Sequence, residues 1–160
     1  MKTVYLLLGG NIGNTKEYFE KAKLNILDLI GKIIKESNIY VSEPWGFEAD
    51  KLFLNQALKV KTILAPQELL EKINFIENKH DRKRESKVYS SRTLDIDILF
   101  YGNEIINEEN LQIPHIHLQN RKFALEPLNE IAPQLIHPKL NKNIKQLLES
   151  CNDNSIVEKL

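Results

Sequence analysis

The most informative part of the chain is the stretch Arg92-Thr93-Leu94-Asp95-Ile96-Asp97-Ile98-Leu99-Phe100. In a strand, side chains two residues apart point to the same face, about 6–7 Å from one another. Asp95 and Asp97 would then share one face, and three apolar side chains would point to a core on the other: Leu94, Ile96 and Ile98. Asp is depleted in strands, so a pair of them asks for a reason. The pair predicts a Mg²⁺ site, because Mg²⁺ prefers oxygen ligands and often brings nucleotide phosphates with it. An edge strand with one solvated face is the structural alternative.

The segment before this strand, residues 79–92, is basic in a chain without net charge. It holds six Lys or Arg residues against two acids, whereas the whole chain has 22 of each kind. Carboxylates for a divalent cation beside guanidinium groups for phosphate oxygens are what a metal–triphosphate requires. A solvated charged loop is the alternative, and the adjacent acidic strand weighs against it.

Composition limits the classes of protein that fit. A length of 160 residues predicts one domain, residues 1–160, that is large enough to bury a core. Charge neutrality argues against a general nucleic-acid binder, and no apolar run approaches the roughly 20 residues of a membrane span. Cys151 is the only cysteine, so we expect no intrachain disulfide and a cytoplasmic location.

Hydrophobic periodicity predicts the element order βαββαβ. We expect strands near residues 3–8, 32–41, 53–62 and at the Asp95/Asp97 stretch, with one helix between Asn14 or Thr15 and Gly31 and another that begins at Pro66. This order predicts an α+β, ferredoxin-like fold, in which two helices cover one face of a four-stranded antiparallel sheet. A C-terminal extension would add a short strand at 104–106 and helices near 120–131 and 144–151. Because this fold hosts many functions, the function has to be argued from the site.

Other residues could carry chemistry. The run Gly9-Gly10-Asn11-Ile12-Gly13 lies between a strand and a helix but lacks the ending of a P-loop, which favours a tight turn over a phosphate cradle. His115 and His117 have no Cys/His cluster nearby that could complete a zinc site, so His115 is better explained as a phosphate contact close to Arg121. Several aromatic residues could be core or could stack on a flat ligand: Trp45, Phe47, Phe53 and Phe123.

Taken together, these segments resemble the 6-hydroxymethyl-7,8-dihydropterin pyrophosphokinase family of folate biosynthesis. The resemblance runs from Val4 to about Pro138 and depends on the order of several motifs: Leu8–Asn14, Phe53–Ala57, Arg92–Ile98, Pro114-His115, Arg121–Leu128 and Glu130–Pro133. It implies the same βαββαβ core. It also implies an ATP-dependent enzyme that transfers pyrophosphate to the hydroxymethyl oxygen of the pterin and releases AMP.

The resemblance also implies roles for individual residues. Asp95 and Asp97 would bind two Mg²⁺ ions, and with Arg82 and Arg92 they would form the catalytic set. ATP binding would involve Glu77, Arg84, Arg92, His115 and Arg121. The pterin would be bound by Ser42, Trp45, Phe53, Asn55 and Phe123, with the two Phe rings on either side of it. The carboxamide of Asn55 would read the edge of the pterin, since it supplies both a donor and an acceptor.

Three departures from the family pattern concern loops rather than metal ligands. Gly10 stands where Ser is common, Glu43 where Pro is frequent, and Tyr89-Ser90-Ser91 where Trp-Gly-Pro often precedes the Arg. We expect ATP and a dihydropterin as partners, no nucleic acid or membrane, a monomer, and potential docking with dihydropteroate synthase. Two alternatives remain: another Mg²⁺-dependent nucleotide phosphohydrolase, which would cleave ATP without a pterin, and a non-catalytic ferredoxin-like module, which would show no Mg²⁺ dependence.

Overall fold

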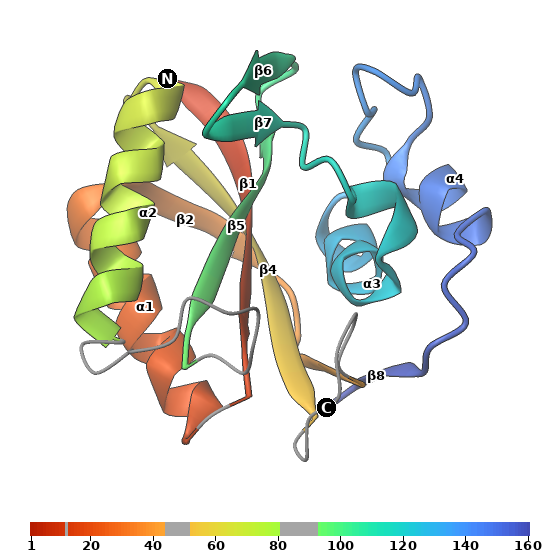
Figure 1. The fold of residues 1–160 in the computed structure, drawn as a ribbon, viewed down its shortest axis with the longest axis horizontal. Coiled ribbons are helices and arrows are strands. Elements are labelled where there is room, and N and C mark those ends of the chain that lie inside the picture. Colours follow the sequence, from red (N-terminus) through yellow and green to blue (C-terminus); the bar gives the residue numbers. More distant parts are fainter. Residues whose placement is uncertain (12, 44–51, 81–92) are drawn as a thin grey trace.

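The computed structural model describes residues 1–11, 13–43, 52–80 and 93–160. At its centre, three antiparallel strands lie side by side in the order β5 (Asp95–Tyr101), β1 (Lys2–Gly10) and β4 (Phe53–Thr62) (Figure 1). Beyond β4, the strands β2 (Gly31–Glu36) and β3 (Tyr40–Ser42) pair with different parts of the same neighbour. This arrangement confirms the predicted ferredoxin-like α+β fold. The strand β1 continues through Gly9 and Gly10, where a turn was predicted.

The prediction of a single strand over 32–41 is wrong, because the strand is interrupted at Ser37. The backbone N–H of Ser37 donates to the carbonyl of Ala57 at 2.9 Å, but its side-chain oxygen, not its carbonyl, accepts from the N–H of Ala57 at 3.0 Å. The hydroxyl also donates to the carbonyl of Asn38. This local bonding by a Ser side chain competes with the strand ladder and separates β2 from β3.

Helices α1 (Thr15–Leu29) and α2 (Pro66–His80) cover one face of the sheet (Figure 1). Asn14 caps α1, since its side chain accepts from the N–H of Glu17 at 3.3 Å. The core on this face is made mainly of aliphatic side chains, with the rings of two aromatic residues: Val4, Leu6, Leu8, Phe19, Ile26, Leu58, Val60, Leu69, Ile73, Ile76, Leu94, Ile96, Ile98 and Tyr101. Each large apolar side chain buried here contributes about 1.5–3 kcal/mol of transfer free energy.

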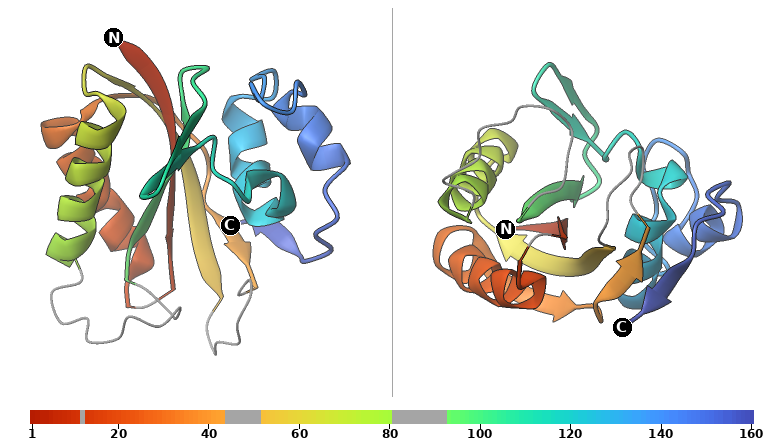
Figure 2. Two further views of the ribbon diagram at one scale, coloured as in Figure 1. Left: turned by 45° about the horizontal axis from the view of Figure 1, so that its top comes forward. Right: turned by 60° about the horizontal axis from the view of Figure 1, so that its bottom comes forward.

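The C-terminal extension places its helices on the opposite face (Figure 2), whereas Leu111 and Ile113 of its hairpin join the first core. It consists of the hairpin β6 (Ile106–Glu108) and β7 (Leu111–Ile113), a short 3₁₀ turn η1 (Leu118–Asn120), and the helices α3 (Lys122–Ile131) and α4 (Ile144–Glu149). The two predicted helices are therefore present with shifted ends, and the predicted strand at 104–106 begins only at Ile106. A second core lies under α3 and α4: Tyr5, Leu7, Ala57, Leu99, Phe100, Leu118, Ala124, Leu125, Leu128, Ile131, Ile144 and Leu147.

A β-bulge in β5 places two successive side chains in the same core. Tyr5 pairs with Phe100 and Leu6 with Ile98, so Leu99 is an extra residue. The side chains of Leu99 and Phe100 consequently both enter the second core. Before the bulge, Ile96 and Ile98 enter the first core, as predicted.

A last strand, β8 (Val157–Lys159), pairs antiparallel with β3 and was not predicted. It brings the C-terminal end of the chain next to the strand that carries Ser42. None of the helices in the described part of the chain has the length and apolar character of a membrane span.

Candidate active site

Two rows of residues run across the sheet on the α3 side. In one row, Asn55 of β4 lies opposite Gly9 of β1, and Gly9 lies opposite Asp95 of β5. In the next row, Leu7 lies between Ala57 and Asp97. Residues opposite one another in an antiparallel pair share a face, so the predicted pterin-binding amide and the two predicted metal ligands project from the same surface.

Glu77 of α2 joins these two aspartates. Its carboxylate accepts from the backbone N–H of Ile96, the residue between them, at 2.8 Å. Burial, the negative charge of Asp95 and a hydrogen bond with Asp95 raise the pKa of Glu77 far above its ordinary value, and the charge of Asp97 adds to this effect. Three carboxyl groups thus gather at the end of α2 and the start of β5, where a cation would relieve their repulsion.

These residues fit a Mg²⁺ ion that is also bound by its substrate. Asp95 and Asp97 are half-buried oxygen donors on one face. Among the residues with described positions, no group of three or more His, Cys, Asp or Glu side chains is arranged to hold a metal ion. Mg²⁺ is commonly held by one or two carboxylates, with water and substrate phosphates as the other ligands. The pair therefore suits a metal that arrives with a nucleotide.

His115 and Arg121 lie beside Asp97, and the three residues line one narrow cleft. The backbone N–H of His115 donates to the carbonyl of Leu99, next to the bulge, at 3.1 Å. Nδ1 of His115 accepts from the N–H of His117 at 3.2 Å, so a neutral ring carries its proton on Nε2. Burial and the positive charges of Arg121 and His117 lower the pKa of His115 to about 4. His115 is therefore a neutral hydrogen-bond donor at pH 7.

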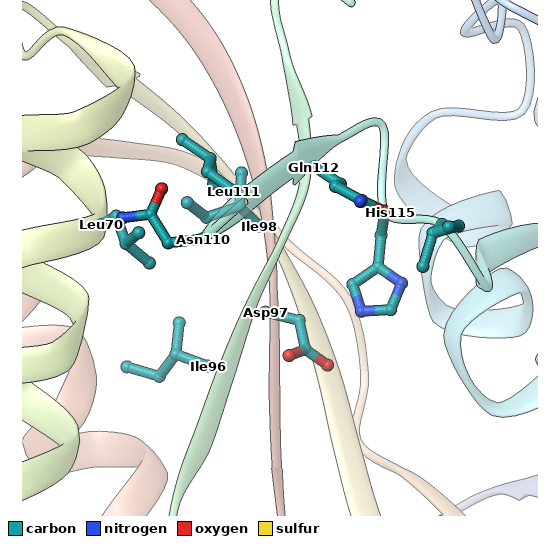
Figure 3. Close-up of a pocket in the computed structure, with 9 residues that line it drawn as sticks. Leu70, Ile96, Asp97, Ile98, Asn110, Leu111, Gln112 and His115 are labelled. Atoms are coloured by element: carbon teal, nitrogen blue, oxygen red, sulfur yellow. The ribbon is translucent and has the colours of Figure 1, made fainter. Parts of the chain in front are cut away.

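A cavity of about 220 Å³ opens on the other side of Asp97 (Figure 3). Its walls come from α2, β5 and the β6–β7 hairpin: Leu70, Ile96, Asp97, Ile98, Asn110, Leu111, Gln112, His115 and Ile116. In Figure 3 the carboxylate of Asp97 and the imidazole of His115 lie on one side of β5, with Leu70 and Ile96 on the other. A mostly apolar cavity with a few polar groups is typical of a small-molecule site.

This cavity was missed at the sequence level, although Asp97 and His115 at its edge were predicted. The apolar residues on its walls look like ordinary core positions, because they occur at strand and helix spacing. Its lip is fixed by hydrogen bonds between α2 and the hairpin: Gln67 donates to Glu108 at 2.6 Å and to Asn110 at 3.2 Å, and Asn110 donates back to Gln67 at 3.2 Å.

Three of the predicted pterin residues, Ser42, Phe53 and Asn55, lie on β3 and β4 at the other end of the first row. Ser42 and Asn55 are both buried, and the amide nitrogen of Asn55 lies 3.5 Å from the hydroxyl of Ser42. Phe53 lies opposite Ser42 in the β3–β4 pair and is half-buried. A Cβ atom at Gly9 would lie 2.9 Å from Oδ1 of Asn55, so the glycine leaves room for that amide.

The start of α3 faces both parts of the site. Phe123 lies in its first turn and packs at the margin of the second core. The guanidinium of Arg121 lies 5.6 Å from the centre of the Phe123 ring, within the range of a cation–π contact. Arg121 itself is buried. Four predicted site residues lie outside the described residues: Trp45, Arg82, Arg84 and Arg92.

The fold and the site define a class of protein, a ferredoxin-like α+β domain with two neighbouring carboxylates beside a small cavity. The sequence model of one family, 7,8-dihydro-6-hydroxymethylpterin-pyrophosphokinase, matches residues 5–133. The chain belongs to this family. The prediction of the family, and with it of an ATP-dependent pyrophosphokinase, is thereby confirmed.

Named relatives agree with this result. A 2-amino-4-hydroxy-6-hydroxymethyldihydropteridine pyrophosphokinase of Aquifex aeolicus is 45% identical over 146 residues, which are 91% of this chain and 90% of the relative. Another of that name, from Haemophilus influenzae, is 36% identical over 99% of this chain and 98% of its own. In structure, the chain resembles wild-type Plasmodium falciparum HPPK-DHPS with a TM-score of 0.77 at 20% identity. The match covers 92% of this chain but only 44% of that longer one, so it supports the fold alone.

Proposed function

We propose that this chain carries out the reaction of its family with the residues gathered on the α3 side of the sheet. It transfers the terminal pyrophosphoryl group of ATP to the hydroxymethyl oxygen of 6-hydroxymethyl-7,8-dihydropterin and releases AMP. The observation that carries this proposal is the row Asn55–Gly9–Asp95. In this row, the side-chain amide proposed to bind the pterin and a carboxylate proposed to bind Mg²⁺ are separated by a single strand, β1. Two substrates bound at its ends would meet over β1.

ATP would bind with its base in the cavity beside β5 and its phosphates toward Asp97, His115 and Arg121. The apolar walls of the cavity suit the faces of the base, and Asn110 and Gln112 at its edge offer polar groups. The Nε2–H of His115 and the guanidinium of Arg121 would donate to phosphate oxygens. Mg²⁺ held by Asp95 and Asp97 would neutralise phosphate charge. We expect Arg82, Arg84 and Arg92 to add further phosphate contacts.

The dihydropterin would bind at Asn55 and Ser42. Both side chains are buried and polar, so they can exchange hydrogen bonds with the heteroatoms on the edge of a pterin ring. Phe53 and Phe123 would contact its faces, and Trp45 would close the pocket. A ligand that left the buried amide of Asn55 without a partner would bind poorly, because an unpaired buried polar group costs about 1–3 kcal/mol.

In this arrangement, the chain's contribution to rate is to position the substrates. Phosphoryl-type transfer leaves little covalent work to the protein and depends on alignment and charge stabilisation. The hydroxymethyl oxygen attacks the β-phosphorus in line, the bond from this phosphorus to the oxygen that leaves with AMP breaks, and the hydroxyl proton passes to solvent. The arginine and histidine donors stabilise the charge that develops on the phosphate oxygens. None of the assigned side chains has to act as a covalent nucleophile.

The proposal also covers the domain organisation, oligomeric state, location and partners of the enzyme. Residues 1–160 would form one catalytic domain, because β8 near the C-terminal end completes the sheet beside β3. We propose a monomer that works in the cytoplasm and can dock with dihydropteroate synthase, without nucleic-acid or membrane partners. In support of such docking, the solved Plasmodium falciparum chain carries the name HPPK-DHPS.

The first experiment measures AMP and ADP formation from ATP and Mg²⁺, with and without 6-hydroxymethyl-7,8-dihydropterin. AMP that appears only with the pterin, in equal amount to the pyrophosphorylated pterin, supports the proposal. Release of ADP or AMP without the pterin would instead favour a nucleotide hydrolase. A chain that binds ligand without any turnover, with or without Mg²⁺, would be a binding module.

A substitution of Asp97 tests the metal assignment. We expect Asp97→Ala to lower kcat by at least about 10²-fold, the scale for loss of one preorganised electrostatic group. Asp28→Asn, at an exposed position of α1, is the matched control and should leave kcat unchanged. A decrease below about threefold at saturating Mg²⁺ would contradict the role of Asp97 as a ligand.

A further inference from the structure

We propose that the C-terminal segment, residues 151–160, holds the two walls of the pterin pocket together, with Asp153 as its positioning residue. The inference depends on the proposed function, since it concerns the dihydropterin site of the same reaction. It assigns a role to a part of the chain that does not line the cavity beside β5.

Asp153 caps the helix that carries Phe123. The first N–H groups of a helix have no partner within it and need an acceptor from elsewhere. Arg121, which precedes α3, supplies no capping side chain within the described structure. The N–H of Lys122 instead donates to Oδ2 of Asp153, 31 residues further along the chain, at 3.1 Å. This hydrogen bond fixes the backbone between Arg121 and Phe123.

The other oxygen of Asp153 holds the carboxylate in place. Oδ1 accepts from the backbone N–H of Ser155 at 3.0 Å and from its hydroxyl at 2.6 Å. Partial burial raises the pKa of Asp153, but the hydrogen bonds from Ser155 and Lys122 outweigh that effect and keep the pKa below its ordinary value. The group is therefore ionised at neutral pH, as suits the positive end of a helix dipole.

The same segment then binds the strand that carries Ser42. In the pairing of β8 with β3, Val157 lies opposite Ser42 and Lys159 opposite Tyr40. The N–H of Leu160 adds a hydrogen bond to the carbonyl of Ile39 at 2.8 Å. Figure 2 shows the segment passing from α4 to the edge of the sheet. A continuous run of about ten residues thus contacts α3 at one end and β3 at the other.

Both contacts concern the pterin side of the site. Phe123 directly follows Lys122, whose N–H group is capped. The position of β3 determines where the hydroxyl of Ser42 lies relative to the amide of Asn55. The cavity proposed for the base of ATP has its walls on α2, β5 and the β6–β7 hairpin, none of which includes residues 151–160. Loss of the Asp153 cap should therefore affect the two substrates unequally.

The test compares Asp153→Asn, Asp153→Ala and the wild-type chain in steady-state kinetics. Asn keeps one acceptor oxygen but cannot serve Lys122 and Ser155 from two carboxylate oxygens at once. Loss of a helix cap, typically about 1 kcal/mol, corresponds to a change of about fivefold. We expect KM for the dihydropterin to rise by about fivefold and KM for ATP by less than about twofold. Hydrogen exchange at the Lys122 amide should be faster.

Glu158→Gln is the matched control, because Glu158 is an exposed acid of the same segment, and it should match wild type. An unchanged KM for the dihydropterin in Asp153→Asn would overturn the inference. So would an equal rise of both KM values together with a lower melting temperature, which would indicate a purely structural role. If Asp153→Ala does not fold, the Asn variant decides. Failure of the wild-type chain to form AMP with the pterin would refute the proposed function instead, and is recognised separately.

Discussion

Gly9 keeps the surface between Asn55 and Asp95 open. It lies opposite both residues in β1, and any side chain there would point to the face on which the substrates are proposed to meet. A Cβ atom would come within 2.9 Å of Oδ1 of Asn55, closer than real Cβ contacts. The requirement for glycine here is thus one of space and not of backbone conformation.

Gly9→Ala should displace the amide of Asn55 and weaken pterin binding. We expect KM for the dihydropterin to rise by about tenfold, which corresponds to roughly 1.4 kcal/mol, with a smaller effect on KM for ATP. The same change in an Asn55→Ala background should add little, because two changes that act through one contact are not additive. Full additivity of the two effects would show that Gly9 acts by another route.

His115 should act through its N–H group and not through a positive charge. Its pKa is lowered to about 4 by burial and by the charges of Arg121 and His117, so a neutral donor of similar reach can replace it. We expect His115→Gln to keep KM for ATP within about threefold of wild type, and His115→Ala to raise it about tenfold, the scale of one hydrogen bond to a charged group. Equal losses in both variants would contradict the donor role.

At the scale of elements, Glu130 connects α3 to the link between β2 and β3. Its carboxylate accepts from the N–H of Asn38 at 2.9 Å and from the hydroxyl of Tyr40 at 2.8 Å, and Lys159 of β8 lies at 3.8 Å. Partial burial alone would raise the pKa of Glu130, but these partners lower it below its ordinary value. Ionised Glu130 therefore stabilises the folded state, and this stabilisation is fully present above the pKa that Glu130 has in the unfolded chain.

Stability should therefore depend on Glu130 in a pH-dependent way. Because the folded-state pKa is depressed, the stabilisation is lost as pH falls through the ordinary range of Glu, about 4.3, toward the folded value. We expect Glu130→Gln to lower the free energy of unfolding by about 1–3 kcal/mol at pH 7, with a smaller difference at pH 3. Urea titrations at both pH values measure this. A difference that does not shrink in acid would rule out the ionised carboxylate as its source.

The elements differ in how far the sequence could predict them. The alternation of acidic and apolar residues from Leu94 to Ile98 specifies a strand and its two faces, and both faces are as expected. The break at Ser37 was not predictable, because it depends on a hydroxyl that bonds to β4, 20 residues away. The strand β8 has only three residues, which is too short for a recognisable alternation of polar and apolar side chains. It forms because it pairs with β3.

The site shows the same contrast. Single residues such as Asp97 and His115 stand out by chemical type, and the structure places both on one narrow cleft. The cavity beside them is built from apolar residues of α2, β5 and the hairpin, which become a wall only after these elements pack. The cap at Asp153 is equally hidden, because the acceptor and the helix that it caps are 31 residues apart.

At the scale of the whole molecule, the two proposed substrate sites lie on opposite sides of the strand β1. The cavity proposed for ATP lies at β5, between α2 and the β6–β7 hairpin, and the residues proposed to bind the pterin lie on β4, β3 and α3. Figure 1 shows these elements on either side of β1. Only β1 separates the two proposed sites, and the residue of β1 between Asn55 and Asp95 is Gly9. Each substrate should consequently stabilise the fold through its own side of the sheet.

Nucleotide binding should then raise the melting temperature only when Mg²⁺ is present. A ligand at 100 times its Kd stabilises the folded state by about 2.7 kcal/mol, which in a chain of this size corresponds to a rise of about 5–10 °C. We expect this rise with a non-hydrolysable ATP analogue and Mg²⁺. It should disappear with EDTA, since the carboxylates of Asp95 and Asp97 would then repel the triphosphate, and in Asp97→Asn, which lacks one of the two proposed Mg²⁺ ligands. Asp28→Asn should keep the full rise. An equal rise in EDTA would mean that the nucleotide binds without the metal, and the pairing of Asp95 and Asp97 would then need another explanation.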